Sequence, residues 1–361
     1  MSTPSISWPQ ALSWRLERQF LSPLGQATAT EVIARLGAVL AMDATLAELA
    51  VQTRQADPVR GELATAVDQG QVITVFAFRG AVHHLPAADA GDLLALRAAG
   101  RQWERKSWVE HYGLTAEMWP EFRAAVREAV TDGPRTVGEL GQAVTRHRPY
   151  RHLAEEFERG AGTLIKPLTW QGDVSFGPPR DGQATFQRLD TNPRFSVSDP
   201  EVAGPAALRR HLRAYGPVTP AHLQHWFVDG LSAGRKKVDH WLREIGDELI
   251  MVDVEGDSAH VLAEDLDALV AARPSSTVRL LPGHDQWVMG PGTSDPHVTP
   301  TAHRDLITRK ANPVTVGGVV RGTWRAHAGE PVITWFDEQT ASTQESEAEV
   351  TRVAGLLALH D

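Results

Sequence analysis

Asp43 is the first residue whose type and surroundings could do chemistry in this chain. It follows the apolar stretch Leu40-Ala41-Met42 and precedes a small residue and a threonine. A carboxylate at this place could act as a general base, or as an anion facing a positive charge that develops on a substrate. An aspartate directly before a helix is also a preferred N-cap, because its side chain accepts a hydrogen bond from the first helical turn. Both interpretations of Asp43 stay open from the residues alone.

Two arginines and a pair of histidines have side chains suited to anions. Arg79 precedes Gly80 in an expected turn, and Arg54 ends an expected helix, so each could contact a phosphate group. Arg79 could equally form an ion pair with a nearby carboxylate. His83 and His84 are neighbours in an expected strand, where adjacent side chains point to opposite faces, so at most one can face a ligand. The alternative for His83 is a surface histidine whose hydrogen bonds are already satisfied.

Asp285 and two further histidines complete the candidates. Asp285 follows His284, which suggests an acid/base dyad, but the preceding Pro-Gly pair is typical of a turn in which an aspartate bonds the backbone. His222 and His225 are three residues apart, a spacing that places both on one helix face and would suit a metal ion. Because no third ligand has a recognisable spacing, we predict no metal site. The chain also has no recognisable Gly-rich phosphate loop.

The helices that must position these residues begin with a repeated signal. In three places a glycine is followed three residues later by a threonine and then, after four more residues, by an apolar residue. The threonine occupies the N-cap position, and twice a glutamate follows at capping-box spacing. The three copies are Gly25/Thr28/Val32, Gly133/Thr136/Leu140 and Gly216/Thr219/Leu223.

Each capped helix is followed by more helical sequence and then by two short strands around a turn. This order is typical of a winged helix-turn-helix, a fold that usually meets DNA. The clearest hairpin has strands at 170–176 and 183–189 around a Pro-Pro-Arg-Asp-Gly turn. The other expected strand pairs are 72–78 with 79–85, and 248–254 with 260–262.

The fold class we predict is α+β, with three tandem winged helix-turn-helix units and a small C-terminal β-containing segment. The expected strands of that segment are 277–281, 313–321 and 332–336, and a helix at 343–359 closes it. The boundaries that follow are 1–117 for unit 1 with flanking helices, 118–195 for unit 2, 196–262 for unit 3, and 263–361 for the C-terminal segment.

Composition narrows the classes of function. The chain has 361 residues and no cysteine, which excludes disulfides, thiolate-bound metals and a cysteine nucleophile. No stretch is long and apolar enough to span a membrane, and no signal peptide is recognisable at the start, so we expect a cytoplasmic protein. The formal net charge of -9 argues mildly against nucleic acid, although the charges are unevenly distributed. Acidic residues gather at 247–267 and 337–349, and basic ones at 97–106, 146–151, 209–213, 235–237 and 304–310.

Four motifs in order give the chain a resemblance to the AlkZ-like family, which includes bacterial DNA glycosylases that unhook alkylated bases and interstrand crosslinks. The resemblance covers nearly the whole chain. It implies three winged-helix units around a DNA-sized concavity, and base excision without a metal or organic cofactor. The motifs are Arg79-Gly80-Ala81-Val82-His83, Trp170-Gln171-Gly172-Asp173 leading to Phe176-Gly177-Pro178-Pro179-Arg180, Leu281-Pro282-Gly283-His284-Asp285, and Gly318 through Arg321-Gly322-Thr323-Trp324.

The chain departs from the family at the chemistry. The family's glycosylases carry two glutamines separated by one residue, just before an aspartate. Aligning on Asp43 places Leu40 and Met42 at those two positions, and neither side chain can hold a water well. Whether the protein is an enzyme is therefore left open by the sequence.

Three functions remain. The first is a monomeric binder of damaged or alkylated double-stranded DNA that does not excise the base, with Arg54, Arg79, His83 and Asp285 as candidate DNA contacts. The second is an active monofunctional glycosylase that uses Asp43 or another carboxylate as its base. The third, of a different class, is a binder of a DNA-reactive small molecule or of a protein partner.

Overall fold

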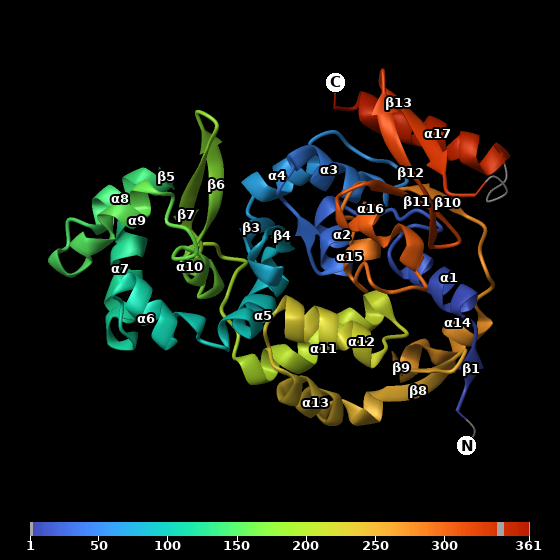
Figure 1. Ribbon diagram of the computed structural model, residues 1–361, viewed down its shortest axis with the longest axis horizontal. Helices are drawn as coiled ribbons and strands as arrows, with labels where there is room; N and C mark the ends of the chain where they lie inside the picture. The colour runs from blue at the N-terminus through green and yellow to red at the C-terminus, as the bar shows by residue number, and fades with distance from the viewer. Residues whose placement is uncertain (1–2, 338–342, 361) are drawn as a thin grey trace.

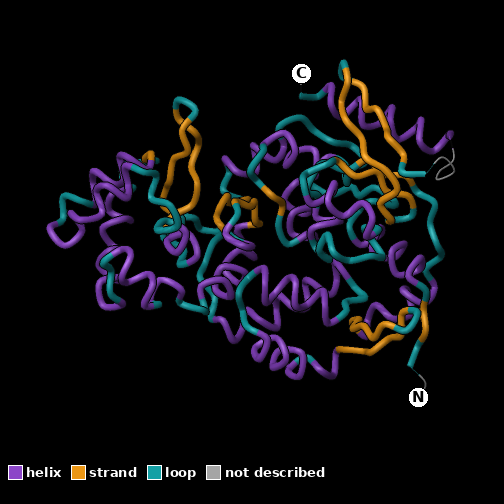
Figure 2. Tube along the Cα trace, in the orientation of Figure 1, coloured by secondary structure: helices purple, strands orange, loops and turns teal. Residues whose placement is uncertain are grey.

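Four small sheets and the helices between them make up the chain, which we describe from a computed structural model covering residues 3–337 and 343–360. Figure 1 shows the sheets distributed around the molecule, with residues from about 100 to 190 forming a lobe on the left. The tube in Figure 2 shows that short strands alternate with helices along the whole chain. The α+β class is confirmed.

The first two helices of the chain begin with a side-chain N-cap. Ser7 caps α1, and Thr28 caps α2 through a capping box with Glu31, as its spacing predicts. The strands β3 and β4 form the expected hairpin, and β2 pairs with the far edge of β4. The elements are α1 (Trp8–Arg18), α2 (Ala29–Leu36), β2 (Val39–Leu40), α3 (Ala44–Gln52), α4 (Glu62–Asp68), β3 (Val72–Phe76), β4 (Val82–Pro86) and α5 (Ala87–Ala98).

The second segment contains the second capping box, between Thr136 and Glu139. Its hairpin differs from the predicted one, because residue 170 ends a helix and the first strand runs to Arg180 through both prolines. The turn is only Asp181-Gly182, both at positive φ, and a register shift between Gly177 and Arg180 accommodates the prolines in the strand. The elements are α6 (Lys106–Tyr112), α7 (Trp119–Ala129), β5 (Arg135–Thr136), α8 (Val137–Val144), α9 (Ala154–Glu158), α10 (Lys166–Trp170), β6 (Val174–Arg180) and β7 (Gln183–Arg188).

The third segment begins its capped helix at Thr219, where His222 occupies the third helical position and completes the box. Its hairpin turns at Glu255-Gly256, as predicted, and the N-terminal strand β1 adds to it in parallel. The sequence did not predict β1, because a two-residue strand carries no periodic signal. The elements are β1 (Ser5–Ile6), α11 (Pro200–Tyr215), α12 (Pro220–Leu223), α13 (Arg235–Glu244), β8 (Leu249–Val254), β9 (Asp257–Leu262) and α14 (Leu266–Ala271).

The C-terminal segment is an antiparallel sheet in the order β10-β11-β12-β13, packed against the closing helix α17. The predicted strand-like segment 313–321 is two strands joined by the hairpin turn that the pair Gly317-Gly318 predicts, with both glycines at positive φ. A further turn at 328–329 was not predicted. A shared core joins this segment to α3 through Leu49. The elements are β10 (Val278–Leu280), α15 (Gln286–Met289), α16 (Arg304–Thr308), β11 (Asn312–Val316), β12 (Val319–His327), β13 (Glu330–Trp335) and α17 (Thr343–Ala358).

Candidate functional site

A small pocket forms where the start of α3 meets the loop before α15. It brings Asp43, Leu40 and Met42 together with Asp285, which lies far along the chain. The volume of the pocket is about 90 Å³. Since about 10–15 Å³ of such space is enough for one water, the pocket has room for several waters. The lining residues are Val39, Leu40, Met42, Asp43, Leu46, Ala50, Gly283, His284, Asp285, Gln286 and Lys310.

Asp43 is the N-cap of α3 and also carries an ion pair at the pocket rim. Its Oδ1 accepts a hydrogen bond from the Leu46 backbone N–H at 3.1 Å, and its Oδ2 lies 3.2 Å from Lys310 Nζ. The backbone hydrogen bond from Leu46, aided by the Lys310 ammonium, lowers the pKa of Asp43 below its usual range. The carboxyl is therefore ionised at neutral pH. The predicted capping geometry is present, and a role as base stays a prediction.

Leu40 and Met42 form the apolar side of the pocket. Leu40 lies in β2, where it is the register partner of His83, and Met42 is 72% exposed. Neither side chain offers a strong donor or acceptor, so this wall cannot hold a water by hydrogen bonding.

Arg54 and Asp285 form a buried ion pair behind the pocket. Arg54 Nη1 and Nη2 lie 2.8 and 2.7 Å from the two carboxylate oxygens of Asp285, and both side chains are 0% exposed. Arg54 also donates to the Ala50 carbonyl, while Asp285 accepts from the Trp287 backbone N–H. Asp285 thus accepts a hydrogen bond from the backbone of its turn, which was the alternative to an acid/base dyad with His284. In this conformation neither side chain has surface to offer a phosphate.

His83 is enclosed in the first sheet. It is 5% exposed, its Nδ1 lies 2.9 Å from the Ala81 carbonyl, and its ring meets Phe78 edge to face. Burial lowers the pKa of His83 to about 4, so the ring is neutral at pH 7. The structure therefore places His83 neither on the surface nor at a charged contact.

Arg79 is exposed at the tip of the first hairpin, with φ of 52°. Its Nη2 lies 2.8 Å from Nδ1 of His225, so its partner is a histidine and not the carboxylate that we considered. His222 instead lies 3.0 Å from Asp295. The two histidines thus have different partners, and residues 3–337 and 343–360 contain no group of three or more side chains suited to a metal ion.

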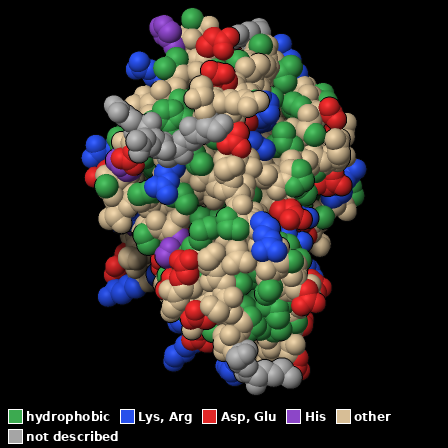
Figure 3. Space-filling view, turned by 90° about the vertical axis from the view of Figure 1, so that its right-hand side faces the viewer, with side chains coloured by type: hydrophobic (Ala, Val, Ile, Leu, Met, Phe, Trp, Pro, Cys, Tyr) green, Lys and Arg blue, Asp and Glu red, His purple; other side chains and the backbone are tan. Residues whose placement is uncertain are grey.

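The basic stretches differ sharply in how their charges are used. All three arginines of 209–213 pair with carboxylates: Arg209 with Glu248, Arg210 with Asp92 and Asp89, and Arg213 with Glu264. On the face in Figure 3, which is the right-hand side of Figure 1, acidic side chains lie among the basic ones.

Two of the three cationic residues in the stretch 304–310 are not in ion pairs with the described residues. Arg304 and Arg309 are exposed, and neither makes an ion pair with any residue that the structure describes. Lys310, at the end of the same stretch, reaches Asp43. Of these three cationic residues, Lys310 is the one that lines the small pocket.

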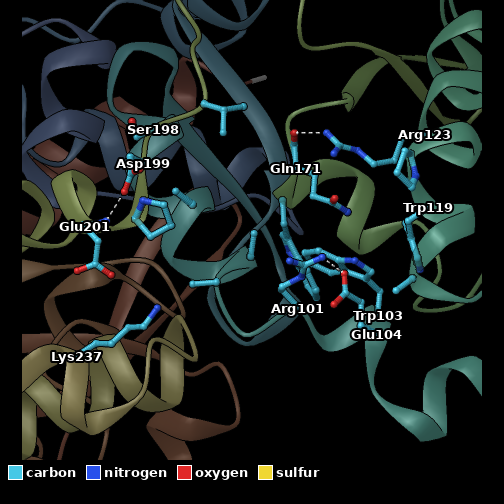
Figure 4. Close-up of a pocket in the computed structure, with 18 residues that line it drawn as sticks. Arg101, Trp103, Glu104, Trp119, Arg123, Gln171, Ser198, Asp199, Glu201 and Lys237 are labelled. Carbon is cyan, nitrogen blue, oxygen red and sulfur yellow. Dashed lines mark hydrogen bonds and ion pairs between the residues drawn. The ribbon is translucent and has the colours of Figure 1, made fainter.

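A larger cavity of about 770 Å³ lies elsewhere, between α7, the end of α5 and the start of α11. Its floor is aromatic, with Trp103, Trp119 and Trp170, and Figure 4 shows Lys237 and Glu201 across from Trp103 and Trp119. This cavity contains none of the candidate chemical residues named from the sequence.

Sequence reasoning missed Gln286 and Lys310 as pocket residues, whereas His284, named beside Asp285, does line the pocket. The family motif that includes Asp285 ends one residue before Gln286, so it did not include the glutamine. Lys310 gave only a charge signal within its basic stretch, and its contact with Asp43 spans 267 positions.

Comparison with known proteins identifies the family. The sequence model described as "DNA glycosylase AlkZ-like" matches residues 33–358, which is most of the chain. The chain belongs to the AlkZ-like DNA glycosylase family. A similar relative in Streptomyces sahachiroi, named "Interstrand DNA cross-link repair glycosylase", is 33% identical over 97% of both chains.

A solved structure of the same family is similar to this one along nearly the whole chain. The structure of the Streptomyces sahachiroi DNA glycosylase AlkZ matches with a TM-score of 0.90, covering 97% of each chain at 33% identity. The resemblance stated from the motifs is thereby confirmed. Among the described residues, no helix is long and apolar enough to cross a membrane.

Proposed function

We propose that this AlkZ-like protein binds damaged or alkylated double-stranded DNA as a monomer, with the sugar of the lesion at the small pocket. The observation that carries the proposal is that Arg304 and Arg309 are exposed and unpaired among the described residues, in the stretch whose last residue, Lys310, lines the pocket with Asp43. Binding to duplex DNA is dominated by cations that replace condensed counterions, so available arginines matter more than the net charge of the whole chain.

The three capped helices with their hairpins support this proposal, because together they have the element order of winged-helix units. We infer that some of these units hold the duplex backbone while the pocket faces the lesion. Arg79, exposed at a hairpin tip, is suited to a phosphate contact. Arg54 and Asp285 act from behind the pocket as positioning residues, and His83 supports the sheet that carries Leu40.

The experiment is equilibrium binding to a duplex with one N7-methylguanine and to its undamaged twin, across a salt series. We expect tighter binding to the damaged duplex and a linear fall of log affinity with log salt. Affinity no tighter than about 10⁻⁴ M, the non-specific level, would contradict the proposal. In the double variant Leu40→Gln, Met42→Gln, excision faster than that of wild type would support an otherwise intact site.

A second candidate function, binding of a small aromatic molecule, is favoured by the larger cavity. Its volume and its three tryptophans fit the typical size and lining of a small-molecule site. Fluorescence of anilinonaphthalene sulfonate tests it, with Ala99→Trp, which fills the cavity, as the matched variant. Equal enhancement by wild type and variant would argue against this second candidate.

A further inference from the structure

The side chains of Leu40 and Met42 cannot hold a water by hydrogen bonding, so a side chain that does so has to be one of the polar residues that line the pocket. Of the polar side chains that line the pocket, Asp43 and Lys310 bind each other, and Asp285 is fully engaged by Arg54. His284 lies 3.2 Å from the Thr308 carbonyl. Gln286 is the polar lining residue that remains.

The side-chain amide of Gln286 is buried but still open to the pocket. The residue is 5% exposed, and its side chain makes no hydrogen bond to any residue of 3–337 or 343–360. Its amide atoms are also absent from the set of fully enclosed, unpartnered polar atoms of the described chain. Because Gln286 is one of the residues that line the pocket, we infer that the surface left to the amide faces it. A buried amide without a partner is costly, so this arrangement favours a water or substrate oxygen as its partner.

Both neighbours of Gln286 are fixed. Asp285 is held by two hydrogen bonds from Arg54, and Trp287 is 0% exposed and donates to the Gly318 carbonyl at 2.7 Å. On the other side of the loop, a Cβ on Gly283 would lie 2.4 Å from the Lys310 carbonyl, so glycine permits this close approach. The amide thus enters the pocket from a rigid turn, which is what positioning a reactant requires.

We propose that Gln286 holds the attacking water in place of the family's two glutamines, and that Asp43 receives the proton; this inference rests on the proposed function. The water oxygen forms a bond to C1′ of the lesion's sugar, and the bond from C1′ to N9 breaks. Its electron pair returns to the alkylated purine, which was cationic and leaves neutral. One water proton passes to the Asp43 carboxylate, so the step needs no other reactant.

The test is single-turnover excision from a duplex with one N7-methylguanine, measured beside duplex affinity and its salt dependence. We expect wild type to release the base, and Gln286→Met, which keeps the length of the side chain and removes the amide, to be at least about 100-fold slower. Its duplex affinity should stay within about twofold of wild type. Gln286→Asn keeps an amide but shortens the chain, and should lose part of the rate.

A matched control is Gln19→Met, which also removes a buried amide but lies away from the pocket, where its Nε2 donates to the Ala214 carbonyl. It should excise at the wild-type rate. If Gln286→Met does not fold, the variant Leu40→Gln, Met42→Gln, Gln286→Ala decides: restored glutamines should rescue excision in the absence of Gln286.

Four outcomes overturn the inference. Excision by Gln286→Met at the wild-type rate would mean that the amide does nothing. Wild type that binds the duplex but does not excise would refute the inference and leave the proposed function standing. Wild type that does not bind the duplex would refute the proposed function itself. Failure of the triple variant to excise would show that an amide on the Leu40 wall cannot replace Gln286, which contradicts the interchangeable roles we propose.

Discussion

Removing Arg54 should destabilise the protein and not weaken a phosphate contact. In Arg54→Met the Asp285 carboxylate stays buried with no countercharge, although it keeps the hydrogen bond from the Trp287 N–H. Breaking a buried ion pair by removing one partner typically costs about 3–5 kcal/mol. The geometry places this pair at the upper end, because two bonds of 2.7 and 2.8 Å join fully buried groups.

A double-mutant cycle separates the pair from its surroundings. Asp285→Asn leaves the Arg54 charge unpaired but retains a side chain that can cap α15, so it should also cost several kcal/mol. In the double variant Arg54→Met, Asp285→Asn no charge is left unpaired, and we expect a coupling energy of about 2–3 kcal/mol.

The assay is urea unfolding followed by tryptophan fluorescence, with duplex affinity measured on each folded variant. Arg209→Met is the control, because its ion pair with Glu248 is solvent-exposed and should be worth under about 1 kcal/mol. A loss of less than about 1 kcal/mol in Arg54→Met, together with a salt slope of DNA binding reduced by about 1, would refute the reasoning. That result would instead make Arg54 the phosphate contact that the sequence suggested.

Three further predictions follow from the same geometry. Asp43→Ala should cost about 1 kcal/mol of stability through the lost N-cap, whereas Asp43→Asn, which can still cap, should keep stability and lose excision; equal excision by wild type and Asp43→Asn would remove the carboxylate from the chemistry. The pKa of His83 is about 4 in the folded chain against an ordinary 6.5, so the stability that depends on its neutral ring is fully present above pH 6.5 and is lost as pH falls toward 4. The melting temperature of His83→Gln should therefore fall less steeply with decreasing pH than that of wild type. An unchanged profile would contradict the burial argument. Arg304→Ala and Arg309→Ala should each lower duplex affinity and reduce the salt slope by about 1, whereas Arg209→Ala should leave the slope unchanged; equal slopes in all three variants would place the DNA elsewhere.

Local signals predicted the helix starts of the fold well. The capping boxes of Thr28 and Thr136 depend only on residues three positions apart, so the sequence contains all the information that forms them. The same reasoning failed at Pro178-Pro179, because whether prolines sit in a turn or in a bulged edge strand depends on the partner strand. It also missed β1, whose register is set by Asp253 of another segment.

The candidate site shows the same boundary between local and long-range information. Asp43 could be predicted as a cap from its neighbours, but its ion pair with Lys310 joins residues 267 positions apart. Arg54 and Asp285 were both candidate DNA contacts from the sequence, but nothing in the sequence indicated that they bind each other across 231 positions. Their ion pair makes them a buried support of the pocket and not exposed contacts. Basic stretches were similarly ambiguous, since only the fold reveals that Arg209 is paired and Arg304 is not.

The two long-range ion pairs fix the two walls of the pocket relative to each other, whichever residues stand at positions 40 and 42. One ion pair joins Arg54, just after α3, to Asp285 before α15, and the other joins Asp43, just before α3, to Lys310 after α16. The distance between the two walls of the pocket therefore does not depend on residues 40 and 42. An amide that enters from the wall of Gln286 then faces the same small volume as one that enters from the wall of Leu40. On our proposal, what the chemistry requires is an amide in that volume beside Asp43, and the fold can supply it from either wall.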